Sequence, residues 1–227
     1  MCGRYTLFTP EQVIEIKNIV KEAEERLRQR NSQNVRAHLV TDEIRPTNLA
    51  PVLFPHEGRL VSAAAFWGFT NHHEWENRKR EAEGKAPLKP SAIFNTRDDK
   101  ADKSPFWRDS FHKRRCVVPA TGFWEWYHAA PVEPGQKMKD QGTKYLFSMP
   151  DSPILYIAGI WQNEIDEATG EKWPHFSMLT TDPSESVAEI HNRMPLVLLP
   201  DERDVWVGDD YKSLLLRPHL ELDKKIA

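Results

Sequence analysis

Residues 115–127 read RCVVPATGFWEWY, and this stretch decides the kind of fold that we expect. Apolar and β-branched residues at 116–119 and alternating aromatic residues at 123–127 predict two short strands. The Ala-Thr-Gly sequence at 120–122 separates them and favours a tight connection, hence a hairpin. The stretch therefore predicts antiparallel strand pairing in the core of the protein.

Strand-like segments also occur on both sides of this stretch. We expect them at residues 4–8, 60–69, 92–96, 145–149, 154–161, 175–181 and 195–199. Helices are fewer: Thr9 as N-cap and Pro10 begin one that runs to about Arg30, residues 184–191 form a short one, and the C-terminus is expected to be helical. Because helices and strands do not alternate regularly, the sequence predicts an α+β fold, with a mainly antiparallel sheet or open barrel-like core flanked by helices.

Three segments interrupt this pattern without dividing the chain. Residues 31–51 are polar and end in a stretch bracketed by two prolines, which predicts an extended loop. Residues 74–90 alternate acids with bases and are expected to form a solvated helical insertion. Residues 128–143 are rich in proline, glycine and lysine and predict a surface loop. We therefore expect a single domain spanning residues 1–227.

Composition excludes several classes of protein. No apolar run approaches the ~20 residues that span a bilayer, and no signal peptide is recognisable, so we expect a cytoplasmic protein. The only cysteines, Cys2 and Cys116, argue against a disulfide scaffold or a four-cysteine zinc site. The pair His72-His73 lacks a further ligand at suitable spacing, so we expect no metal site there. A net charge of −3 disfavours non-specific duplex binding.

The N-terminus carries the first chemical signal. Cysteine is small enough for Met1 to be trimmed, which would leave Cys2 with an α-amine and a thiol on adjacent carbons. An α-amine has a pKa of about 7.7–8.0, so far more of it is neutral at pH 7 than of a lysine amine. With an aldehyde, such a pair can form an imine and then a thiazolidine ring. The alternative is that Cys2 is an ordinary residue at a frayed terminus.

Three internal polar positions could assist this chemistry. Glu125 lies between Trp124 and Trp126 on a predicted strand, so it is either desolvated, with a raised pKa, or simply faces water. His191 sits at a helix-to-strand junction and is either an acid–base group or structural. Asn95 and Arg97 share a face at a strand end, where they could orient a nucleophile and bind a phosphate, or cap a turn.

Several blocks together resemble the SRAP family (SOS response-associated peptidases). They are Met-Cys-Gly-Arg at residue 1, Asn48-Leu49-Ala50-Pro51, Phe66-Trp67-Gly68, Phe94-Asn95-Thr96-Arg97, RCVVPATGFWEW at 115–126 and IHNRMPLVL at 190–198. They follow the family's order up to about residue 200. The chain departs from the family after Gly68, where Phe69-Thr70-Asn71-His72-His73 replaces a proline-rich segment, and at Asn192, where the family has aspartate.

The resemblance implies an abasic-site processing protein with the family's fold. It implies a stable thiazolidine crosslink between Cys2 and the ring-opened sugar of an abasic site in single-stranded DNA, with lyase-like activity and an autopeptidase-type removal of Met1. Transferred by motif, Cys2, Asn95, Glu125 and His191 would be catalytic. The DNA contacts would be Arg4, Arg97 and Arg193 on phosphates and Trp67 on a base. The expected protein is a cytoplasmic monomer, nucleoid-associated when bound to DNA, that acts in DNA repair without a membrane, metal or cofactor.

Two other functions remain as alternatives. One is an N-terminal-nucleophile amide hydrolase or cysteine peptidase that uses the Cys2 thiol. The other is a single-strand-binding module in which Cys2 is incidental, and whose binding would be reversed by salt.

Overall fold

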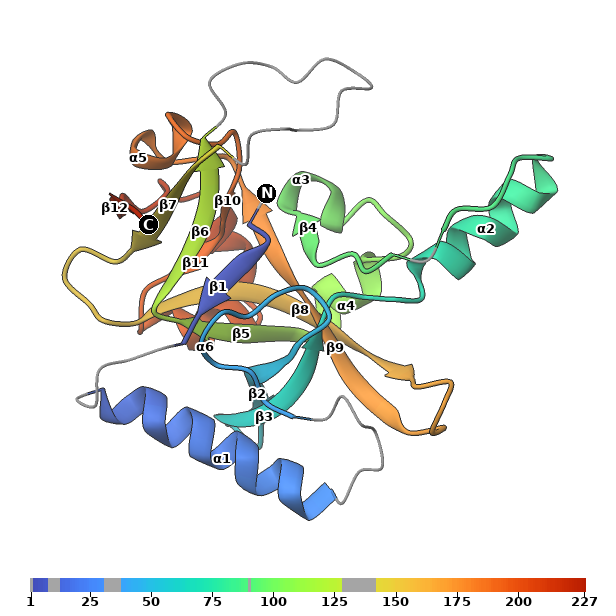
Figure 1. Ribbon diagram of the computed structural model, residues 1–227, viewed down its shortest axis with the longest axis horizontal. Helices are drawn as coiled ribbons and strands as arrows, with labels where there is room; N and C mark the ends of the chain where they lie inside the picture. Colours follow the sequence, from blue (N-terminus) through green and yellow to red (C-terminus); the bar gives the residue numbers. More distant parts are fainter. Residues whose placement is uncertain (1, 8–12, 31–37, 90, 128–141) are drawn as a thin grey trace.

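The largest sheet of the protein closes on itself as a barrel (Figure 1). The computed structural model describes residues 2–7, 13–30, 38–89, 91–127 and 142–227. Pairing runs from β9 (Lys172–Thr181) through β3 (Arg59–Trp67), β2 (Leu49–His56), β5 (Arg115–Ala120) and β8 (Leu155–Ile165), which pairs again with β9. Only the β3–β9 pair of this ring is parallel. The expected α+β fold with a mainly antiparallel core is confirmed, but the barrel is closed rather than open.

Short strands extend the barrel, and a second sheet lies against it. The strands added to the barrel are β4 (Asn95–Arg97) and β10 (Met194–Pro195), both on β9, and β11 (Val197–Leu198) on β8. The second sheet is antiparallel, in the order β1 (Arg4–Thr6), β6 (Gly122–Tyr127), β7 (Thr143–Ser148) and β12 (Asp223–Ile226). The N-terminal strand therefore belongs to the smaller sheet, beside the strand that carries Glu125.

The predicted hairpin at residues 115–127 is wrong. Both strands exist, but β5 pairs with β2 and β8, whereas β6 pairs with β1 and β7. At the corner between them, Thr121 donates its backbone N–H to the Thr6 carbonyl at 2.7 Å, and a side chain at Gly122 would come within 2.8 Å of the Phe147 carbonyl. The stretch thus crosses from the barrel to the smaller sheet, because residue alternation predicts strands but does not select their partners.

Helices cover the outside of the barrel and its ends. They are α1 (Ile14–Arg30), α2 (His72–Ala82), α3 (Asp98–Ala101), α4 (Arg108–Lys113), α5 (Glu185–Ala188), α6 (Glu202–Val207) and the 3₁₀ helix η1 (Tyr211–Leu215). α1 buries Ile16, Ile19 and Ala23 and is helical up to Arg30, while its predicted start at Thr9 and the residues directly after Arg30 lie outside the described residues. α2 has no buried residue and projects from the body, which confirms a solvated helix (Figure 1).

Three further sequence predictions can be compared with these elements. The C-terminus ends in strand β12 rather than in a helix, because β7 has an open edge that this segment pairs. The predicted loop at 31–51 gives way to strand β2 at Leu49, whereas most of the predicted loop at 128–143 lies outside the described residues. No helix in the described ranges is both long and apolar enough to cross a bilayer.

Trp67 belongs to the barrel core. Its side chain is fully buried, and its indole N–H donates to the Phe94 carbonyl at 2.9 Å. The ring packs edge-on against Tyr5, with centroids 5.1 Å apart, and is parallel to Phe176 at 6.3 Å. Because no face of this ring is open to solvent, its position contradicts the expectation that Trp67 stacks on a DNA base.

Replacing Trp67 should therefore lower the stability of the folded protein. We expect Trp67→Ala to lower the free energy of unfolding by about 3–5 kcal/mol, since it removes a buried aromatic side chain. Trp67→Phe should cost less because most of the ring volume remains. Urea unfolding monitored by circular dichroism measures both, with Trp124→Ala, at a half-buried position, as the matched control. Equal losses in Trp67→Ala and Trp124→Ala would contradict the core assignment.

Candidate active site at the N-terminus

Cys2 is buried at the entrance to strand β1. Its side chain is 1% exposed, and its thiol lies 3.5 Å from the Arg4 carbonyl. Burial raises the pKa of the thiol well above its ordinary value, and the nearby Glu125 carboxylate raises it further. This position does not fit an ordinary residue at a frayed terminus, and it keeps the thiol protonated at neutral pH.

Asn95 fixes the backbone of Cys2. Strand β4 lies parallel to β9 and presents the Asn95 amide, whose Nδ2 donates to the Cys2 carbonyl at 2.8 Å. The other end of this amide, Oδ1, is buried and has no hydrogen-bond partner within the described part of the chain. A buried acceptor in this state is costly unless a ligand supplies the donor. Asn95 can therefore hold Cys2 and accept a hydrogen bond from a bound molecule.

Glu125 lies on the inner face of β6. The burial pattern of this strand follows the predicted alternation, with Phe123 and Glu125 buried and Trp124 and Trp126 partly exposed. The side chain of Glu125 is 2% exposed, so the alternative that it faces water is wrong. Burial raises its pKa from 4.5 to about 7. At neutral pH both its protonated and ionised forms are populated, as general acid–base catalysis requires.

His191 follows α5 and is held through one ring nitrogen. Its backbone N–H donates to the Val187 carbonyl at 2.9 Å, which continues the turn of α5. Its Nδ1 lies 3.0 Å from both the carbonyl oxygen and the backbone nitrogen of Arg193. Nδ1 can accept from that N–H when the ring is neutral and can donate to that carbonyl when the ring is protonated.

Arg193 connects the segments that carry His191 and Asn95. Its guanidinium is buried; Nη2 donates to Asp98 at 2.6 Å and also to the Thr180 carbonyl, and Nη1 donates to Asp182 at 2.7 Å. Asp98 directly follows strand β4. Both Nη groups are thus engaged by protein partners, which favours a structural tie over the predicted phosphate contact.

Arg4 and Arg97 remain nearer the surface. Arg4 donates to Glu43 at 2.7 Å and lies over the Trp126 ring at 5.1 Å, with its side chain 35% exposed. Arg97 makes two 2.9 Å hydrogen bonds to Asp99, and its side chain is 44% exposed. Exposed ion pairs contribute at most about 1 kcal/mol, so either arginine can exchange its carboxylate for a phosphate at small cost.

The structure thus brings most of the predicted catalytic residues together. Asn95 touches Cys2, Glu125 acts on it electrostatically, and His191 is tied to the Asn95 strand through Arg193. Sequence reasoning missed Asp98, whose pairing with Arg193 joins residues 95 positions apart and leaves no local pattern. It also missed Tyr5, a fully buried neighbour whose pKa is raised by burial and by the charge of Cys2. Strand alternation in the first six residues could have indicated Tyr5.

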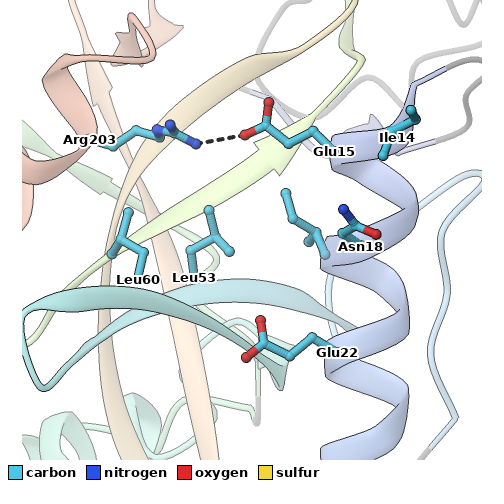
Figure 2. A pocket seen from close by; sticks show the side chains of 8 residues that line it. Ile14, Glu15, Asn18, Glu22, Leu53, Leu60 and Arg203 are labelled. Atoms are coloured by element: carbon cyan, nitrogen blue, oxygen red, sulfur yellow. Dashed lines mark hydrogen bonds and ion pairs between the residues drawn. The ribbon is translucent and has the colours of Figure 1, made fainter.

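Other polar groups lie apart from this site. No cluster of three metal-ligating side chains occurs within the described ranges. A pocket of about 370 Å³ between α1 and the β2–β3 hairpin has Leu53 and Leu60 on one side and Glu15 on the other (Figure 2). Glu15 there pairs with Arg203 at 2.8 Å and accepts a hydrogen bond from the buried Tyr156 hydroxyl. None of the predicted site residues lines this pocket, and the contacts of Glu15 beside it hold α1 against the rest of the protein.

Comparison with known proteins places the chain in a family. A protein of known structure from Bacteroides thetaiotaomicron superposes with a TM-score of 0.65 at 22% identity, over 99% of this chain and 91% of that one, and so shares the fold. The family described as SOS response associated peptidase (SRAP) matches residues 1–222. The chain therefore belongs to the SRAP family.

Curated relatives carry names that describe an activity. Abasic site processing protein YoaM of Bacillus subtilis is 27% identical over 136 residues, which cover 56% of this chain and 54% of YoaM. Abasic site processing protein HMCES of Gallus gallus is 27% identical over 139 residues, covering 55% of this chain and 40% of HMCES. The chain thus spans about half the length, or less, of these relatives.

The raised pKa of Glu125 predicts a pH-dependent stability. Folding favours the protonated carboxyl, so its contribution is complete below pH 4.5 and is lost as the pH rises through about 7. Glu125→Gln cannot ionise and should lack this loss. Between pH 4.5 and 8, the unfolding free energy of the wild type should therefore fall by about 3 kcal/mol relative to the variant. Urea unfolding of both proteins across this range measures the difference, and parallel curves would contradict the assignment.

Proposed function

We propose that this protein processes abasic sites in single-stranded DNA by crosslinking them covalently to Cys2 after Met1 has been removed. The observation that carries the proposal is the burial of Cys2 beside Glu125, an acid with a pKa of about 7. The Asn95 amide holds Cys2 there by a hydrogen bond to its carbonyl. Membership of the SRAP family and the names of the curated relatives support the substrate class. The removal of Met1 is the peptidase-like step of this scheme.

The crosslink forms in two steps whose atoms balance. The α-amine of Cys2 attacks the aldehyde carbon of the ring-opened sugar, and the resulting carbinolamine loses water to give an imine. The thiol then adds to the imine carbon, so that a C–S bond forms and the thiol proton moves to the nitrogen. The product is a thiazolidine, and one water is released. No oxidant, reductant or cofactor is required.

Glu125 is suited to both proton transfers. In its protonated form it can give a proton to the departing hydroxyl of the carbinolamine. In its ionised form it can take the thiol proton, which the raised pKa of Cys2 otherwise retains. A pKa of about 7 lets one residue perform both tasks in sequence. We assign His191 to proton transfer at the imine and in reversal of the crosslink.

The DNA strand would be held by surface groups around this centre. Arg4 and Arg97 are exposed enough to bind phosphates that flank the lesion. The unpartnered Oδ1 of Asn95 would accept a hydrogen bond from a hydroxyl of the open sugar. An abasic residue lacks a base and its stacking, so moving it into the protein costs less than extruding an intact nucleotide.

The environment of Cys2 weighs against a cysteine peptidase. Such enzymes use a thiolate, and their microenvironments lower the cysteine pKa. Here burial and the Glu125 carboxylate both raise it. A reaction that begins at the amine and brings in the thiol second fits this environment better.

Loss of the thiol should abolish the stable product. Incubation with single-stranded DNA that contains one abasic site should give the wild type a complex that survives heating in sodium dodecyl sulfate. We expect Cys2→Ala to give none, because an imine without ring closure hydrolyses. A variant with two residues inserted between Met1 and Cys2 should also fail, because its amine and thiol no longer share one residue. Gel electrophoresis measures the yield, and a crosslink by Cys2→Ala equal to that of the wild type would overturn the proposal.

Removing the titratable proton of Glu125 should slow the reaction without unfolding the protein. We expect Glu125→Gln to lower the single-turnover crosslinking rate by about 10²–10⁴-fold at pH 7, the usual contribution of a general acid–base group. Its melting temperature at pH 7 should be at least that of the wild type, since no buried charge remains. An unchanged rate would remove Glu125 from the mechanism.

A further inference from the structure

The segment that follows η1 is attached to the helix preceding His191. Glu221 lies just before strand β12, and its two carboxylate oxygens accept separate backbone hydrogen bonds. Oε1 accepts from the N–H of Glu185 at 3.0 Å, and Oε2 accepts from the N–H of Ser186 at 2.8 Å. These are the first two residues of α5. One side chain thus satisfies two backbone donors that a helix start otherwise leaves open.

Neighbours of Glu221 strengthen the same attachment. The N–H of Leu222 donates to the Ser186 hydroxyl at 3.0 Å. The Lys224 ammonium donates to the Ser186 carbonyl at 3.2 Å and to the carboxylate of Glu189. Contacts therefore reach both the start and the end of α5. The hydrogen bonds from Ser186 also lower the pKa of Glu221, so its carboxylate is ionised at neutral pH.

α5 depends on such external contacts because it is very short. It spans four residues, Glu185–Ala188, whereas isolated helices shorter than about 12–15 residues are marginal in water. The same turn continues directly to the candidate catalytic histidine, since the N–H groups of Ile190 and His191 both donate to the Val187 carbonyl at 2.9 Å. The start of α5 is thus separated from the backbone of His191 by about one and a half turns of hydrogen-bonded chain.

We propose that Glu221 is a positioning residue that fixes His191 through α5. The proposal rests on the proposed function, which gives His191 a role in proton transfer. Glu221 touches no reacting atom in this scheme. Its carboxylate holds the start of α5, and the position of His191 depends on the helical turn that follows. The segment just before β12 then supports the site, although it supplies no catalytic group.

A double-mutant cycle tests this coupling. We expect Glu221→Ala to slow single-turnover crosslinking about tenfold, since small misplacements of catalytic groups cost this much or more. Glu221→Gln keeps one acceptor oxygen and should recover part of the rate. Asp223→Ala, an exposed residue on β12, is the matched control and should match the wild type. In a His191→Ala background, Glu221→Ala should cause no further loss; an equal, independent loss in that background would overturn the proposal.

Hydrogen exchange separates this proposal from the proposed function. Faster amide exchange at residues 185, 186 and 191 in Glu221→Ala, with an unchanged melting temperature, is the expected structural result. If wild-type protein forms no crosslink, the proposed function fails, while the exchange data still test the attachment of α5. If His191 exchanges at the wild-type rate in Glu221→Ala, the attachment does not control His191 and the inference is overturned. Should Glu221→Ala unfold, the same comparison is made with Glu221→Gln.

Discussion

The hydrogen bond from Asn95 to the carbonyl of Cys2 is the contact on which the site depends. It joins Cys2, which lies just before the smaller sheet's edge strand β1, to β4, a strand added to the barrel. Without it, Cys2 would sit at the end of a three-residue strand, where chain ends usually fray. In the folded protein the residue is nearly inaccessible to solvent, and that burial raises the pKa of its thiol.

Burial has different consequences for Glu125 and for the Cys2 thiol, the two titratable groups at the centre of the site. It moves the pKa of Glu125 toward neutrality, where the carboxyl can exchange protons, and it suppresses ionisation of the Cys2 thiol. The two effects support each other, because a charged Glu125 further disfavours a thiolate beside it. These pKa values therefore suit proton exchange between Glu125 and the Cys2 thiol better than a thiolate that is already present before a substrate binds. This distinguishes the Cys2 thiol from a nucleophile that must be ionised before its substrate arrives.

The residues that could be predicted from the sequence are those whose role depends on a local pattern. Alternation in β6 predicted that Glu125 and Phe123 share a face, and the helical repeat predicted a helix as far as Arg30. The predicted hairpin at residues 115–127 is wrong because the alternation of residues does not indicate which strand will be the pairing partner. The predicted stacking of Trp67 on a DNA base is not supported because the side chain is buried, and a sequence motif does not indicate burial. The pairing of Arg193 with Asp98 could not be predicted, since it joins residues far apart in the chain.

The pairing of β1 with β6 also has a consequence for the order of events in folding. Tyr5 exchanges backbone hydrogen bonds with Ile44 but lies opposite Phe123 in the sheet, so the N-terminal strand lacks its sheet partner until more than half of the chain has been synthesised. Contacts between such distant segments form slowly, because loop closure must come first. The smaller sheet, whose strands lie at residues 4–6, 122–127, 143–148 and 223–226, is therefore completed only late in synthesis of the chain. Cys2 can thus take its buried position beside Glu125 only after the chain has grown past β6.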